Sequence, residues 1–168
     1  TDKEGLSSVL MFFSAAQAKA LARLAIQQSK DKKEYQNALK AAPSMDMALF
    51  GRMVAADPSL NFDAAAQVAH AISTHAVHNE YDYFTAVDDL IRGEESGAGH
   101  LGTVEFNSAT LYRYATVNVI ELQKNLGTQT EEAVKCFAEA FIKTMPTGKQ
   151  NTFANRTLPD FVYIALRT

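Results

Sequence analysis

In the last third of the chain, the spacing of hydrophobic residues changes from that of a strand to that of a helix, and this change restricts the folds that the chain can adopt. Residues 110–119 are rich in aromatic and β-branched side chains that alternate as in a strand. A helical pattern opens at Thr128 or Thr130 and runs to Met145, just before a proline. Residues 161–166 then form a second strand-like apolar run. This order predicts strand, helix and strand.

The N-terminal part is predicted to be mainly helical. A short apolar run over residues 8–13 has the pattern of a strand, and Ser14 with Gln17 after it matches a helix capping box. Strong helix formers over residues 15–29 predict an amphipathic helix. Asp31 can cap a second, shorter and lysine-rich helix that ends before Pro43.

The middle of the chain is less regular. Hydrophobic periodicity does not decide between helix and strand for the alanine-rich residues 64–77. Residues 79–107 are polar, aromatic and glycine-bearing, with paired acids at 88–89 and 94–95. This composition predicts a long excursion or a mobile loop.

Length and composition fit one soluble globular domain. The chain has 168 residues, 47% of them hydrophobic, and its apolar runs are far shorter than the roughly 20 residues of a membrane-spanning helix. The start at Thr1 has no basic stretch and no apolar signal core, which favours the cytoplasm, and the missing initiating Met suggests processing or a fragment. The single cysteine, Cys136, is expected to be a buried structural thiol rather than a nucleophile.

Charge is unevenly distributed along the chain. The formal net charge of -3 argues against the whole chain being an electrostatic nucleic-acid binder. Residues 143–167 are locally basic, because Asp160 is their one acidic residue and they contain four cationic residues: Lys143, Lys149, Arg156 and Arg167. The glycine-bearing residues 146–157 could offer cations and amides to phosphates, with Phe153 stacking on a base, although an ordinary solvated loop explains them equally well.

Evidence for catalysis is weak. His70, His75 and His78 with Asp82 or Asp88 raise the possibility of a metal site, but their spacing matches no common ligand motif. Asp88 and Asp89 could form an acid-base pair, yet adjacent acids in a polar segment are usually solvated. No serine lies in a nucleophile-elbow pattern. We therefore expect no catalytic residues, no metal and no cofactor.

Six segments, in order along the chain, resemble one known family. They are MALFGRM at 47–53, VAHAISTH at 68–75, DYFTAVDD at 82–89, HLGTVEF at 100–106, LYRYA at 111–115 and TGKQ at 147–150. Together they resemble the CasC (Cse-type) backbone subunits of the type I-E CRISPR Cascade complex, in the RAMP superfamily. The resemblance is specific from about Met45 to Leu166, which implies an internal portion of a longer subunit.

The resemblance implies an α+β fold with an incomplete RRM-like (ferredoxin-like) palm, a helical fingers insertion and a β-hairpin thumb. On this template, residues 1–63 hold a strand and the fingers, 64–78 a palm strand, 79–106 the thumb and 107–168 the second half of the palm. The alanine-rich segment, undecided from periodicity, is then a strand.

The same resemblance implies a function in antiviral defence. Several copies would bind along one crRNA, together with other Cascade subunits, and present it for pairing with target DNA; no membrane is implied. The implied RNA-binding residues are Arg52, Met53, Phe84, Thr85, Arg113, Lys149, Gln150, Asn155 and Arg156. Arg113 could equally pair with an acid across a sheet. A metal-dependent ribonuclease using His75, His78 and the paired aspartates is the alternative.

Overall fold

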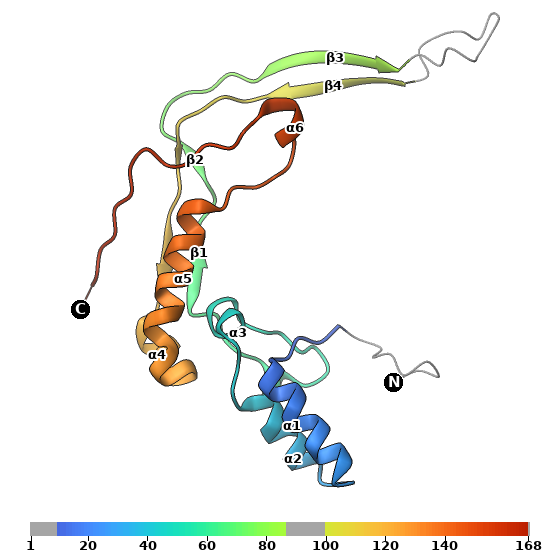
Figure 1. The fold of residues 1–168 in the computed structure, drawn as a ribbon. Coiled ribbons are helices and arrows are strands. Elements are labelled where there is room, and N and C mark those ends of the chain that lie inside the picture. Colours follow the sequence, from blue (N-terminus) through green and yellow to red (C-terminus); the bar gives the residue numbers. More distant parts are fainter. Residues whose placement is uncertain (1–9, 87–99, 168) are drawn as a thin grey trace, which may run out of the picture. The chain divides into compact units, whose positions relative to one another are not determined.

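The computed structural model describes residues 10–86 and 100–167 (Figure 1). They divide into two compact units, one with residues up to 67 and from 116 onward, the other with residues 68–115. Helices and small antiparallel sheets occur together, so the predicted α+β class is confirmed. No helix in the described part of the chain is long and apolar enough to cross a membrane.

The N-terminal helices form where the sequence predicts them. The first, α1 (Ala15–Ile26), has the expected capping box: Gln17 N donates to Ser14 Oγ and Ser14 N donates to Gln17 Oε1, both at 3.0 Å. Asp31 caps α2 (Lys32–Lys40) by accepting a hydrogen bond from Lys33 N. Two short elements follow, α3 (Met45–Phe50) and the 3₁₀ helix η1 (Pro58–Leu60).

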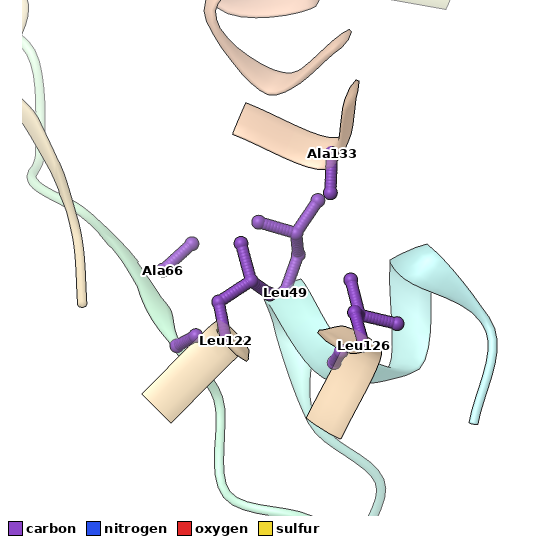
Figure 2. Packing of buried hydrophobic residues seen from close by; sticks show 7 residues of the cluster. Leu49, Ala66, Leu122, Leu126 and Ala133 are labelled. Carbon is purple, nitrogen blue, oxygen red and sulfur yellow. The ribbon is translucent and has the colours of Figure 1, made fainter. Parts of the chain in front are cut away.

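A small apolar core lies in the first unit, between α3, the start of β1 (Ala66–Val68), α4 (Val119–Leu126) and α5 (Thr130–Lys143). Figure 2 shows Leu122, which is fully buried, directed toward Leu49 and Ala66. Leu126 and Ala133 extend the cluster. Much of this core is alanine, so it contributes less apolar burial than leucine or phenylalanine would at the same positions.

The strands of the described residues form three two-stranded sheets. β1 pairs with β6 (Ala115–Val117), and β2 (Ile72–Ser73) pairs with β5 (Leu111–Tyr112). The third sheet is the hairpin of β3 (Glu80–Ala86) and β4 (His100–Phe106). Where the structure describes residues 79–107, at 79–86 and 100–107, the expected loop is instead largely regular antiparallel sheet, and Asp88 and Asp89 lie outside the described residues. The division into palm, fingers and thumb stays a prediction.

Two expected strands are wrong. Residues 161–166 and residues 10–13, the described part of the run at 8–13, carry no strand, and within the described chain neither segment has a ladder partner. Residues 8 and 9 lie outside the described residues. A strand requires a neighbouring strand to satisfy its backbone groups, and apolar alternation alone cannot provide one. The expected helix before Pro146 is confirmed as α5, preceded by η2 (Gly127–Gln129) and followed by α6 (Gln150–Phe153).

The expectation of a buried thiol is also wrong. Cys136 is exposed on α5, because the apolar stripe that packs against the core runs through Ala133 and Phe137 instead. Desolvation and the neighbouring Glu132 and Glu139 raise the pKa of the Cys136 thiol. A raised pKa lowers the thiolate fraction at neutral pH, which disfavours nucleophilic chemistry there.

Candidate nucleic-acid interface

The β3–β4 hairpin presents aromatic side chains on both of its faces. Its antiparallel register pairs Tyr83 with Thr103 and Phe84 with Gly102. Since successive side chains of a strand point to opposite faces, Tyr81 and Tyr83 share one face and Phe84 lies on the other. Tyr81 is 65% exposed and Tyr83 74%. Large aromatic surface is thus left on a two-stranded ribbon, an element of marginal stability by itself.

Phe84 is held in a defined position on this ribbon. Its ring lies directly over Gly102, where an added Cβ would stand 2.4 Å from Phe84 Cζ. The ring also meets the His100 imidazole, with centroids 5.5 Å apart and planes at 44°. Phe84 keeps 44% of its surface exposed. Its neighbour Thr85 is exposed and pairs with Leu101.

The base of the hairpin is tied by side-chain amides. Asn107 Nδ2 donates to Asn79 Oδ1 at 2.7 Å, and Asn79 Nδ2 donates to Glu105 Oε2 at 3.2 Å. Both bonds link the chain just before β3 to the end of β4 and beyond it. They fix the strand register from which Phe84 projects.

Arg52 and Met53 are adjacent in sequence and opposite in environment. Arg52 is 4% exposed and Met53 is 81% exposed. Burial lowers the pKa of the Arg52 guanidinium. Met53, with Phe50, Asn61 and Asp63, lines a shallow hollow of about 290 Å³.

The segment around α6 gathers four of the implied RNA-binding residues. Lys149 caps α6 in the left-handed conformation (φ +58°), and Gln150 begins the helix. Asn155 Nδ2 donates to Gly148 O at 3.2 Å, so this amide closes the segment on itself. The side chains of Lys149 and Arg156 are both exposed, while Gln150 is half-buried.

Arg113 lies between β5 and β6 and is half-buried. The rings of Tyr112 and Tyr114 on either side of it stack at 6.4 Å with planes at 14°. Of the nine implied residues, Arg52, Met53 and the four of the α6 segment thus belong to the first unit, and Phe84, Thr85 and Arg113 belong to the second, where Arg113 lies outside the β3–β4 sheet that holds Phe84 and Thr85.

The helical hairpin of α1 and α2 carries exposed cations; the sequence predicts a lysine-rich second helix there, but none of these cations is among the implied RNA-binding residues. Residues 15–40 carry six cations against two carboxylates, Asp31 and Glu34. All six are exposed, and none forms an ion pair within the part of the chain that the structure describes. They are Lys19, Arg23, Lys30, Lys32, Lys33 and Lys40. A count of charge by helix, rather than over the whole chain, would have included these cations among the candidates.

In the part of the chain that the structure describes, which excludes Asp88, no three metal-ligating side chains come together. His75 is engaged through both ring nitrogens: Thr110 N donates to Nε2 at 3.1 Å, and Nδ1 lies 2.9 Å from Ala76 O. This imidazole links β2 to the segment before β5.

Comparison with known proteins gives a family and similar solved structures. The family model described as CT1975-like protein matches residues 1–168. No curated protein matches the chain. A chain from a structure titled "CRISPR RNA-guided surveillance complex, pre-nicking" is 36% identical, with a TM-score of 0.75, over 92% of this chain and 46% of that one.

A second similar structure is titled "CRISPR RNA-guided surveillance complex". It is also 36% identical, with a TM-score of 0.60, over 89% of this chain and 54% of that one. The chain thus spans about half the length of the solved chains that it matches. The resemblance to the Cascade subunit family is confirmed.

Proposed function

Since the chain belongs to the CT1975-like protein family, we propose that it is a non-catalytic backbone subunit of a Cascade-type surveillance complex. In this function, several copies bind one crRNA in the cytoplasm and hold it for pairing with target DNA. The subunit needs no cofactor, and other Cascade subunits complete the complex. The 36% identity to chains from CRISPR RNA-guided surveillance complexes supports the proposal.

The observation that carries the proposal is the exposed aromatic hairpin with Phe84 fixed over Gly102. An apolar wedge can separate stacked bases at a cost of a few kcal/mol, and stacking on an aromatic ring returns about 1–3 kcal/mol per base. A ring that is already held in place loses little conformational freedom on binding. We assign the β3–β4 hairpin as the thumb and Phe84 with Thr85 as its contact with the guide.

The remaining contacts follow from exposure and charge. Met53 would pack against a base displaced by the thumb of a neighbouring copy. Lys149, Gln150 and Arg156 would contact phosphates, with Asn155 shaping their segment, and Arg113 would contribute from the second unit. Phosphate contacts provide affinity without sequence preference, as a subunit that holds many different guides requires. On this assignment α1 and α2 are fingers, and β1, β6 and α5 belong to an incomplete RRM-like palm.

The experiment is nuclease protection of crRNA in complexes assembled from the full-length subunit. Phe84→Ala is expected to weaken guide binding by about tenfold and to shorten the protected RNA, because stacking worth about 1–3 kcal/mol is lost. Tyr81→Ala is the matched control, since it removes an exposed aromatic ring from the same strand on the opposite face.

Unchanged protection in a folded Phe84→Ala complex would remove this role from the thumb. RNA cleavage that requires a divalent metal and is lost in Asp88→Ala would replace the scaffold function with that of a ribonuclease.

A further inference from the structure

The chain around Arg52 is fixed by a short antiparallel bridge. Arg52 N donates to Phe62 O at 3.0 Å, and Phe62 N donates to Arg52 O at 2.9 Å. Gly51 has φ +81°, and a Cβ there would stand 2.9 Å from Phe62 O. In extended chain, neighbouring side chains point to opposite sides. The direction of Arg52 therefore determines the direction of Met53.

The Arg52 guanidinium is saturated by neutral oxygens. Its Nε and Nη2 donate to Leu60 O at 3.2 and 2.6 Å, and Nη2 also donates to Leu39 O at 3.0 Å. Its Nη1 donates to Phe12 O at 3.1 Å and to Gln17 Oε1 at 3.3 Å. Burial and these acceptors leave this side chain poorly placed to reach a phosphate.

The same network reaches both N-terminal helices. Gln17 is 1% exposed, and its Nε2 donates to Leu39 O and Ala41 O, each at 2.8 Å. Ser14 Oγ donates to Ala42 O at 2.7 Å. Three segments thus meet at the Arg52 guanidinium: the chain before α1, the end of α2 and the end of η1.

The oxygens that accept hydrogen bonds from Arg52 belong to several chain segments, and only the planar guanidinium of arginine has donors directed at all of them. Lysine carries one ammonium with three donors at a single point and cannot reach carbonyls on three segments. The Phe62 ring lies 4.9 Å from Arg52 Cζ, and it packs on a planar cation better than on an ammonium.

We propose that Arg52 is a positioning residue that acts through Met53 and is not itself a ligand of the guide. It fixes the Arg52–Phe62 bridge to the N-terminal helices and so presents Met53, the next residue, at its 81% exposure. This inference rests on the proposed function, because it requires Met53 to contact RNA.

The two roles predict opposite effects of Arg52→Lys. A phosphate ligand would tolerate lysine, whereas a positioning residue would not. The experiment uses the full-length subunit in its crRNA complex, with a diazirine-bearing amino acid at position 53 and, in separate samples, at position 84. The readout is the ratio of RNA crosslinking from position 53 to that from position 84, which lies in the other unit.

Arg52→Lys is expected to lower this ratio by about fivefold or more, in the range of coupling between contacting residues. Arg52→Met is expected to lower it equally and to leave the salt dependence of RNA binding unchanged. Phe62→Leu, which removes only the ring beside the guanidinium, is also expected to lower the crosslinking ratio. If the Arg52 variants do not assemble, the ratio in Phe62→Leu is the test.

An unchanged ratio in Arg52→Lys, or in Phe62→Leu where that variant decides, would overturn the inference. So would a salt slope that flattens by about 0.7 in Arg52→Met, since this is the value for one lost single-strand phosphate contact. If position 53 of the wild-type complex gives no crosslink while position 84 does, the inference fails and the thumb assignment remains. If neither position crosslinks to crRNA, the proposed function fails as well.

Discussion

At the scale of single residues, Gly102 and Phe84 act as one unit. The ring occupies the space that any side chain at position 102 would need, with only 2.4 Å between the added Cβ and Phe84 Cζ. Glycine weakens a strand, because it has high chain entropy and no side chain to pack. Here an aromatic ring from the facing strand covers the glycine and recovers part of that loss.

Gly102→Ala is expected to push the Phe84 ring off β4 and to lower crRNA affinity by about fivefold, a coupling of about 1 kcal/mol. In a Phe84→Ala background the same substitution should have no effect, because nothing remains to collide with. The measurement is a double-mutant cycle of crRNA affinity in the assembled complex. Thr103→Ala is the control, since it changes the next residue of β4, which pairs with Tyr83 on the face opposite Phe84.

Equal losses in the two backgrounds would show that Gly102 acts on the strand itself and not on Phe84.

Asp57 links η1 to α2 through its carboxylate. Ser59 Oγ donates to Asp57 Oδ1 at 2.7 Å, and Gln36 Nε2 donates to Asp57 Oδ2 at 2.9 Å. These side-chain bonds, from Ser59 and then Gln36, lower the pKa of the Asp57 carboxyl from its ordinary value of 3.8. The folded state thus favours the ionised form.

The contribution of Asp57 to stability should be complete above pH 3.8 and be lost as the pH falls through the lowered pKa. Thermal unfolding of wild type and Asp57→Asn should therefore differ at pH 6, and the difference should shrink below pH 3.8. Asp46→Asn removes one carboxylate from α3 and controls for net charge. A difference between wild type and Asp57→Asn that stayed constant across this range would contradict the assignment.

At the scale of elements, the sequence predicts what is locally encoded. Three features depend only on neighbours two to four residues away, and all three are present: the Ser14 capping box, the Asp31 cap and the helix before Pro146. Strands depend on partners far along the chain. This is why residues 161–166 have a strand pattern without a strand, and why the composition of residues 79–107 predicts a loop where the described part contains the β3–β4 hairpin.

In the candidate site, too, the sequence predicts local properties and not those that depend on distant contacts. Exposed cations such as Lys149 can be found from the sequence, because charge is a property of one residue. The burial of Arg52 could not be predicted, because it arises only when the chain before α1, the end of α2 and the end of η1 meet.

The α6 segment offers a test of electrostatic binding. Lys149→Glu is expected to weaken crRNA binding and to reduce the slope of log affinity against log salt by about 0.7, the value for one single-strand phosphate contact. Lys135→Glu makes the same charge change on an exposed residue of α5 and should leave the slope nearly unchanged. Affinities measured between low and physiological salt give both slopes.

Equal slopes of log affinity against log salt for Lys149→Glu and Lys135→Glu would mean that Lys149 contributes only to the overall electrostatic field of the protein and makes no phosphate contact.

At the scale of the molecule, the described chain leaves many large apolar side chains in solvent. Leu10, Ile26 and Ile120 are all at least 74% exposed, and Phe161, Tyr163 and Leu166 at least 79%. Removing an apolar side chain from water is favourable, so binding of a partner that covers these side chains would be stabilised by their burial. The small alanine-rich core and this exposed surface support a subunit that is completed within an assembly.

Net charge fits the same interpretation. The chain carries a formal charge of -3, yet the cations of α1 and α2 and of the α6 segment stand on exposed surfaces. Local positive surface on an acidic chain limits non-specific binding to nucleic acid while keeping binding at chosen sites.

The central claim is that this protein holds guide RNA as part of an assembly. The most direct measurement is the length distribution of RNA that copurifies with the full-length subunit, expressed together with its operon and treated with nuclease. We predict crRNA of one uniform length, protected by several copies of the subunit. A folded, monomeric protein that carries no protected RNA would contradict the claim.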